Sequence, residues 1–251
     1  MSHYCVGVII NNTNNIEADI EKILAPYDEN LEVEPYIYKT KAELIQQAKD
    51  YKICVQRRTE KADYITTEYE QSYLNAQTDE ELYNLWCEDY NTYNENGDEL
   101  STYNPQSKWD WWVVGGRYSR KNNVLQIKDF VLYNTPTNKQ IKHYKKCWEY
   151  LNGEIEVEDP FKEFGYELGM FKKEYLKERY GSLDNLIKSE MSNIPYAFVD
   201  ENGWYEQGKM GWFGMDDATK ESIDGYTKFA ENYFRDVKNQ DKYIVFVDCH
   251  I

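Results

Sequence analysis

The sequence has no apolar run near the roughly eighteen residues that a membrane-spanning helix needs. Its first residues also lack the charged stretch, apolar stretch and cleavage site of a secretory signal. Its five cysteines are widely spaced, and none lies in a CxxC or CxxH arrangement. Such spacing does not predict a closed zinc site, and an odd count favours reduced thiols. We therefore expect a soluble, cytoplasmic protein with no metal site, no cofactor and no membrane partner.

Positive charge is also scarce. The chain of 251 residues has 29 Lys and Arg against 45 Asp and Glu, which gives a formal net charge of −16. Because cations that release counterions from phosphates drive most nucleic-acid binding, we expect no direct binding of DNA or RNA. An acidic surface instead favours solubility, a basic protein partner, or mimicry of a nucleic acid.

The negative charge is concentrated between residues 60 and 100. Thr78 is followed by three acidic residues, as at the start of a capped helix, so this tract is predicted to be helical and exposed. It is either a solvated acidic face or a docking surface for a basic partner. One Lys (Lys61) stands there against twelve carboxylates: Glu60, Asp63, Glu68, Glu70, Asp79, Glu80, Glu81, Glu88, Asp89, Glu95, Asp98 and Glu99.

Residues 104–120, NPQSKWDWWVVGGRYSR, are unlike the rest of the chain, because they combine three tryptophans, two adjacent glycines and several cations. The pattern predicts a strand with two chemically different faces. Strict alternation puts Trp109, Trp111 and Val113 on one face and Asp110, Trp112 and Val114 on the other.

Two glycines and a cation follow this strand. Gly115 and Gly116 allow positive φ or a close approach of another group, and Arg117 adds a planar guanidinium with five donors. Together they could cradle an anion beside an aromatic wall. The alternative is a Trp-rich core strand that ends in a Gly-Gly bulge, with Arg117 paired to an acidic neighbour. The segment matches neither the P-loop nor the dinucleotide fingerprint, since it lacks the GK[ST] ending and a third glycine.

A second segment, PYAFVDENGWYEQGKMGWFGM, also combines aromatic residues with glycine. Its Asn202-Gly203 pair predicts a tight hairpin between two strands. Aromatic rings beside glycines can form slots for a flat ligand, or they can cover glycines within a twisted sheet. If the two segments converge, the candidate ligand-binding residues are Lys108, Trp109, Asp110, Trp111, Trp112, Gly115, Gly116, Arg117, Trp204 and Trp212.

The first and last strands each carry a histidine. If these strands are neighbours, His3, His250 and Asp248 could converge as a base and an orienting carboxylate. Neither histidine has the His-x-Thr/Ser pattern of a two-histidine phosphoesterase, and both could simply be satisfied by backbone or water. By contrast, His143 lies between lysines and is expected to be exposed. The candidate catalytic residues are Asp110, His250, His3 and Asp248.

Apolar runs separated by long helical stretches, without a regular βαβ period, predict an α+β fold with a mostly antiparallel sheet. The predicted strands lie near 3–10, 109–116, 124–133, 196–213 and 243–249, and the strands at 109–114 and 124–133 are expected to pair. We predict a single α+β domain over residues 1–251, with helical insertions at about 41–103 and 137–191.

Several short motifs occur in a fixed order along the chain: SHYCVGVI, APYDEN, SKWDWW with GGR, GWYEQGKMGWFGM and the terminal VDCHI. Together they resemble those of a family of uncharacterised bacteriophage-encoded proteins. The resemblance implies a viral origin, action in the host cell cytoplasm, and a role in host takeover or counter-defence. It implies no particular activity.

Two functional hypotheses remain. In the first, the tryptophan segments form a pocket that binds, and in one version degrades, a small anionic ligand such as a nucleotide. In the second, the acidic tract mimics a nucleic acid and binds a basic host protein without chemistry. The sequence leaves open whether the protein is an enzyme.

Overall fold

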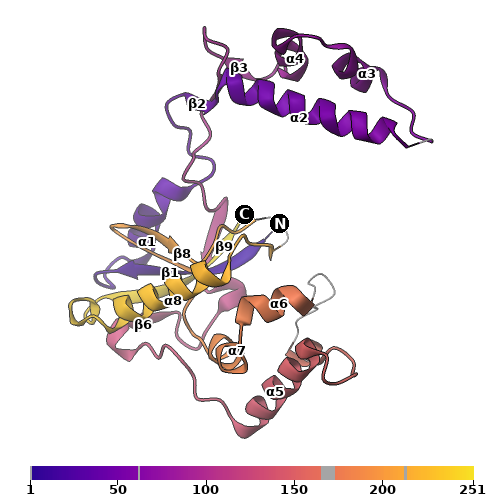
Figure 1. Cartoon of the computed structure of the whole chain (residues 1–251). Coiled ribbons are helices and arrows are strands. Elements are labelled where there is room, and N and C mark those ends of the chain that lie inside the picture. The colour runs from indigo at the N-terminus through magenta and orange to yellow at the C-terminus, as the bar shows by residue number, and fades with distance from the viewer. Residues whose placement is uncertain (1, 62, 165–172, 212–213) are drawn as a thin grey trace. The chain divides into compact units, whose positions relative to one another are not determined.

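The computed structural model describes residues 2–61, 63–164, 173–211 and 214–251. The chain forms two compact units (Figure 1): Met1–Glu29 with Gln106–Ile251, and Asn30–Pro105. The fold is α+β with mostly antiparallel sheets, as predicted. The second unit is wider than the expected insertion at 41–103. Among the described residues, no helix combines the length and the apolar character needed to cross a membrane.

The first unit is built on a six-stranded sheet of order β5-β9-β1-β7-β8, in which β6 also pairs with β9. Its neighbours are antiparallel except for the parallel pair β1 and β7. The strands are β1 (His3–Ile10), β5 (Trp111–Val114), β6 (Val124–Gln126), β7 (Ala197–Asp200), β8 (Gly203–Glu206) and β9 (Tyr243–His250).

Strands β1 and β9 form the centre of this sheet. Both are rich in β-branched and aromatic residues, which favour strands, and both are buried over nearly their whole length. They pair from His3 opposite His250 to Ile10 opposite Tyr243. The condition set for the two histidines is therefore met: the two terminal strands are neighbours, with His3 opposite His250.

The predicted pairing of 109–114 with 124–133 is wrong, because β5 and β6 each pair with a different half of β9. β5 lies opposite Val247–His250 and β6 opposite Tyr243–Val245. The eight-residue β9 is long enough for both. Strand β6 ends at Gln126, well before residue 133.

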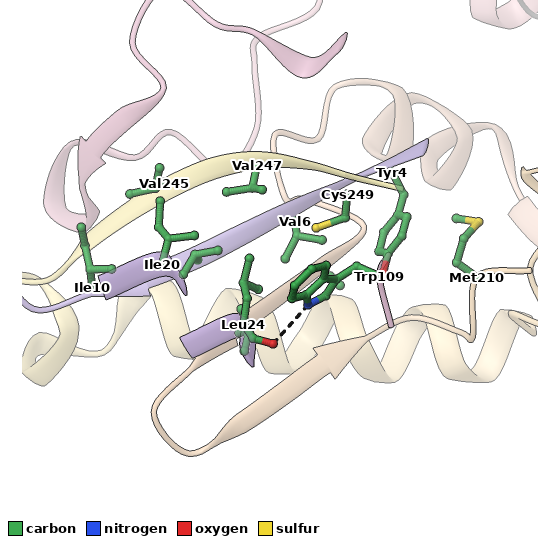
Figure 2. Packing of buried hydrophobic residues seen from close by; sticks show 13 residues of the cluster. Tyr4, Val6, Ile10, Ile20, Leu24, Trp109, Met210, Val245, Val247 and Cys249 are labelled. Carbon is green, nitrogen blue, oxygen red and sulfur yellow. Dashed lines mark hydrogen bonds between the residues drawn. The ribbon is translucent and has the colours of Figure 1, made fainter. Parts of the chain in front are cut away.

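Helix α1 (Ile16–Leu24) and helix α8 (Lys220–Arg235) cover opposite faces of the sheet. On the α1 face, Val6, Val247 and Cys249 pack with Leu24 and Trp109, as Figure 2 shows. On the α8 face the buried residues include Ile9, Phe198, Phe234, Ile244 and Phe246. Because neighbouring strand residues point to opposite faces, a single apolar run supplies both cores.

Three helices form a smaller core beside the sheet: α5 (Asn138–Asn152), α6 (Lys173–Tyr180) and α7 (Leu183–Glu190). His143 was expected to be exposed, which is wrong: it is buried, and its Nε2 lies 3.2 Å from the Sγ of Cys147. The two residues are one helical turn apart on the buried face of α5, which carries the histidine inward despite its lysine neighbours.

The second unit contains α2 (Lys41–Thr59), α3 (Glu68–Asn75) and α4 (Asp79–Trp86). Its small sheet has the order β2-β4-β3, from β2 (Tyr36–Lys39), β3 (Thr92–Tyr93) and β4 (Glu99–Ser101). A core of Ala48, Tyr73, Ala76 and Leu82 joins the three helices.

Threonine starts most of the longer helices. The cap predicted at Thr78 is confirmed, because its side chain accepts a hydrogen bond from the backbone N–H of Glu81 while Glu81 accepts one from the backbone of Thr78. This reciprocal arrangement satisfies two donors that a helix start leaves free. The same capping box begins α2, α3, α5 and α8, at Thr40, Thr67, Thr137 and Thr219.

Candidate functional site

Three rings form a cluster at the ends of β5, β9 and β1, in which each ring contacts the other two. The strand register places Trp111 opposite His250, and His250 opposite His3. The indole of Trp111 stacks on the imidazole of His250, with ring centroids 5.0 Å apart and planes inclined by 16°. The two imidazoles meet edge to face at 5.0 Å. Directly opposed residues in antiparallel strands share a face, so the pairing itself brings these three rings together.

Each histidine is held by its own carboxylate. The Nδ1 of His250 lies 2.6 Å from Oδ1 of Asp110, and the Nδ1 of His3 lies 3.0 Å from Oδ1 of Asp248. An ionised carboxylate can only accept a hydrogen bond, so each Nδ1 carries the proton. Each neutral imidazole therefore presents Nε2 as a base.

The Gly-Gly-Arg sequence holds one of these carboxylates. The backbone N–H of Arg117 donates to Oδ2 of Asp248 at 2.9 Å. Gly116 has φ of 51°, and a Cβ atom there would lie 2.5 Å from the same oxygen. Two features of this position thus require glycine: the positive φ and the close approach of Asp248. The motif does bind an anion, but that anion is a carboxylate of the chain itself.

The Nε2 atoms of both histidines remain open. His3 and His250 form no hydrogen bond through Nε2 with any described residue, although their side chains are only 13% and 5% exposed. Within the described part of the chain, no buried side-chain nitrogen or oxygen lacks a hydrogen-bond partner. Each Nε2 therefore keeps at least some contact with solvent.

Three other tryptophans lie on the opposite face of the sheet. Trp109 is buried in the α1 core, and its Nε1 donates to the carbonyl oxygen of Leu24 at 3.1 Å (Figure 2). Trp112 and Trp204 pack against the same core. These three side chains thus pack on the α1 face, whereas Trp111 lies on the other face with the two histidine rings.

The strict alternation expected for this segment is wrong at its start. Trp109 packs with Trp112 rather than with Trp111. The chain bends at Asp110: Trp109 forms an isolated bridge with Asp28, whereas the N–H of Asp110 already donates to the carbonyl oxygen of His250. This bend shifts the pattern of faces by one residue.

Of the remaining candidate ligand-binding residues, some are held by contacts within the chain and one is exposed to solvent. Lys108 forms an ion pair with Glu206, so its ammonium is already occupied. The Nε1 of Trp204 donates to the same carboxylate. Arg117 is exposed, and its side chain has no ion pair with a described residue. Trp212 lies outside the described residues.

One thiol lies near the histidines. Cys5 is directly opposite Asp248 and therefore on the same face of the sheet. Burial raises the pKa of its thiol to about 11, against a smaller opposite effect of Arg120. At neutral pH the thiol stays protonated, which makes it a poor nucleophile. The described residues contain no group of three or more His, Cys, Asp or Glu that could hold a metal ion.

Sequence reasoning did not anticipate the role of Tyr118, whose hydroxyl donates to the backbone oxygen of His3 at 2.9 Å. It also did not anticipate that Asp110 serves His250 while Asp248 serves His3. Asp110 and Asp248 are visible in the sequence as acidic residues near Trp111 and His250. Their partners cannot be predicted from it, because the partners depend on strand register.

Comparisons with protein-family models, curated proteins and solved structures found no match. A functional assignment therefore depends on the geometry of this site.

Proposed function

We propose that the first unit binds a small phosphate ester at His3 and His250 and cleaves it by general acid–base catalysis. One observation carries the proposal: two adjacent imidazoles each give Nδ1 to a carboxylate and use Nε2 in no hydrogen bond with a described residue. A pair of such groups can act on two atoms of one substrate at once.

The two histidines would divide the proton transfers. One neutral imidazole takes a proton from the attacking hydroxyl group, while the other, protonated, gives a proton to the leaving oxygen. Such transfers contribute about 10²- to 10⁴-fold each to the rate. Asp110 and Asp248 are positioning residues that fix the tautomer of each ring and stabilise its protonated form. The exposed Arg117 supplies positive charge for the phosphate.

The resemblance to phage proteins supports a biological role for this chemistry. Cleavage of a phosphate-containing signal in the host cytoplasm would act as counter-defence, as expected for the small-ligand hypothesis. The ligand-binding residues in this proposal are Trp111, His3, His250 and Arg117. Trp109, Trp112 and Trp204 belong to the α1 core instead.

The test is a panel of phosphate esters assayed for product release by mass spectrometry, covering nucleotides, cyclic dinucleotides, dinucleotides and nitrophenyl esters. His3→Gln and His250→Gln should each lower kcat by about 10²- to 10⁴-fold, with a normal melting temperature. The rate should rise and then fall with pH, because one imidazole must be neutral and the other protonated.

The third histidine provides the control. His143 lies in the helical core, away from the proposed site, so any activity loss in His143→Gln should be explained by its stability alone. Asp110→Asn should lower kcat by up to about 10⁴-fold, since an amide no longer fixes the tautomer of His250. If the His3→Gln variant and the His250→Gln variant each cleave the ester at the wild-type rate, the proposal is refuted.

The acidic-mimic hypothesis is less well supported, because several carboxylates of residues 60–100 already have partners inside the second unit. Glu70 is buried and accepts from Tyr64 and Thr67. Asp98 accepts from the backbone N–H of Lys41. Two further carboxylates of the tract, Asp79 and Glu80, pair with Lys49 and Lys41.

A separate experiment distinguishes this second hypothesis. Glu88→Gln with Asp89→Asn removes charge from two exposed side chains without removing a helix cap, whereas a change at Glu81 would remove one. Phosphoesterase activity should be unchanged in the double variant. A salt-sensitive complex with a basic host protein that needs Glu88 and Asp89, but neither histidine, would favour the mimic instead.

A further inference from the structure

We propose that the substrate is a short ribonucleotide diester, whose base stacks on Trp111 and whose own 2′-hydroxyl attacks the phosphorus. The inference rests on the proposed acid–base function of His3 and His250. It adds the class of substrate, the source of the nucleophile and a residue that determines specificity.

Trp111 is suited to hold a base. One side of its indole stacks on His250, and its ring also meets His3 at 5.2 Å, yet 43% of the residue is exposed. Other aromatic side chains of the described chain are as exposed, for example Tyr38 and Tyr90, so it is the position of Trp111 beside two imidazoles that distinguishes it. Exposed aromatic rings are stacking platforms for nucleobases. A base on the outer side of Trp111 would bring its sugar and phosphate close to the two imidazoles, since both imidazoles contact the indole.

Apart from the two imidazoles, which the proposal uses for proton transfer, the described residues at the site offer no competent nucleophile. Cys5 is held as a thiol by burial, which raises its pKa to about 11. The Oγ of Ser2 donates to the oxygen of Gly211 and accepts from the N–H of Gly214. The hydroxyl of Tyr118 donates to His3, and burial raises its pKa to about 12. The attacking oxygen must therefore come from water or from the substrate.

A substrate that carries its nucleophile has a large advantage. A well-oriented intramolecular group acts at an effective concentration on the order of 10⁵ to 10⁸ M. In a ribonucleotide diester the 2′-hydroxyl lies next to the phosphorus on the same sugar. Two proton-transfer groups are then all that the protein has to supply, and His3 and His250 are two such groups.

The step balances without another reactant. The neutral imidazole takes the proton of the 2′-hydroxyl as its oxygen bonds to phosphorus. The bond from phosphorus to the 5′-oxygen of the next nucleoside breaks, and the protonated imidazole gives that oxygen its proton. The products are a 2′,3′-cyclic phosphate and a nucleoside with a free 5′-hydroxyl. After the step, each histidine has the protonation state that the other had before. Proton transfer to and from water returns both to their starting states.

Charge favours a short substrate over a polymer. The formal net charge is −16, and Asp110 and Asp248 flank the imidazoles. A long polyanion binds through many cations, which in this chain are outnumbered by carboxylates, whereas a dinucleotide brings a single diester to the site.

The decisive experiment compares the diribonucleotide of adenosine with its 2′-deoxy analogue, which differs by one oxygen atom. The ribonucleotide should yield a 2′,3′-cyclic phosphate by mass spectrometry, and the analogue should yield no product. Cleavage of both at similar rates, still dependent on His3 and His250, would overturn this inference and leave the proposed function intact. If no ester of the wider panel is cleaved in a histidine-dependent way, the proposed function itself fails.

Trp111 is tested separately. Trp111→Ala should raise KM for the diribonucleotide by about 5- to 150-fold, the usual value of one base stacked on an aromatic ring, and Trp111→Phe should restore most of the affinity. Val113→Ala is the matched control, because Val113 is on the same face of β5, two residues on, and is also 43% exposed. Its KM should stay within about 2-fold of the wild type, in line with the small effects of most surface changes. An unchanged KM in Trp111→Ala would exclude the stacking platform.

Discussion

Trp109 and Trp111 are the same residue type, two positions apart, and yet they belong to opposite faces of one sheet. Trp109 is 8% exposed and fills the core under α1, whereas Trp111 is 43% exposed and stacks on His250. An uninterrupted strand would place both on one face. The bend at Asp110 separates them, and it also directs the Asp110 carboxylate to His250.

The difference between Trp109 and Trp111 shows that a tryptophan-rich segment does not by itself identify a ligand-binding surface. Trp109 has the apolar surroundings and the satisfied Nε1 of a structural residue. Trp111 has open surface and polar, ionisable neighbours, as expected for a functional residue. The two residues should therefore respond differently to the same substitution.

The largest predicted effect is on stability at Trp109. Trp109→Ala should lower the free energy of unfolding by about 3–5 kcal/mol, because it leaves a cavity in the α1 core and removes the hydrogen bond to Leu24. Trp111→Ala should lower it by less than about 1 kcal/mol, since much of that side chain is already in water. Urea unfolding of both variants checks the comparison. Equal losses would mean that both tryptophans are structural.

Gly116→Ala should have the next largest effect. Its positive φ costs about 1–3 kcal/mol for a residue with a side chain, and its new methyl group would press on Asp248. Activity should fall by more than the loss of folded protein explains, because Asp248 positions His3.

Gly153→Ala separates these two causes. Gly153 also has positive φ, at 74°, but no atom beyond its chain neighbours lies within 4 Å of the position that a Cβ atom would take there. The Gly153→Ala variant should be less stable than the wild type but should keep full activity per folded molecule. If both glycine variants retain the same activity per folded molecule, the cradle around Asp248 has no functional role.

The smallest predicted effect is the loss of stability at alkaline pH that the thiols of Cys5 and Cys249 cause, on the two faces of the sheet. Burial raises the pKa of Cys5 from 9.0 to about 11, so between these values the unfolded chain loses a proton that the folded chain keeps. The free energy of unfolding should fall as pH rises from 9 to 11, by about 1 kcal/mol at pH 10. Burial also raises the pKa of Cys249, on the α1 face.

Differences between variants isolate these thiols from the many tyrosines that titrate in the same range. Cys5→Ala and Cys249→Ala should each unfold with a weaker dependence on alkaline pH than the wild type. In the native protein at about pH 8, iodoacetamide should modify the exposed Cys54 well before either of them. Rapid modification of Cys5 would show that it is accessible from the site and contradict its assignment as an inert thiol.

Much of the fold could be predicted because its signals are local. The apolar runs of β1 and β9, the periodicity of α1 and the cap at Thr78 each lie within a few residues of chain. The hairpin turn at Asn202-Gly203 is another such signal, confirmed by the pairing of Asp200 with Gly203. The pairing of β6 was missed because a strand's partner depends on the whole sheet rather than on its own residues.

The sequence by itself determined the residue types of the site: two histidines at the chain ends, Asp248 beside one of them, and a Trp/Gly segment with Asp110. Only the tertiary structure decided how they are used. The register of β9 against both β1 and β5 brings His3, His250 and Trp111 into one cluster. The bend at Asp110 then divides the tryptophans between core and site. Register and bends arise from long-range packing and hydrogen bonds, which no local pattern encodes.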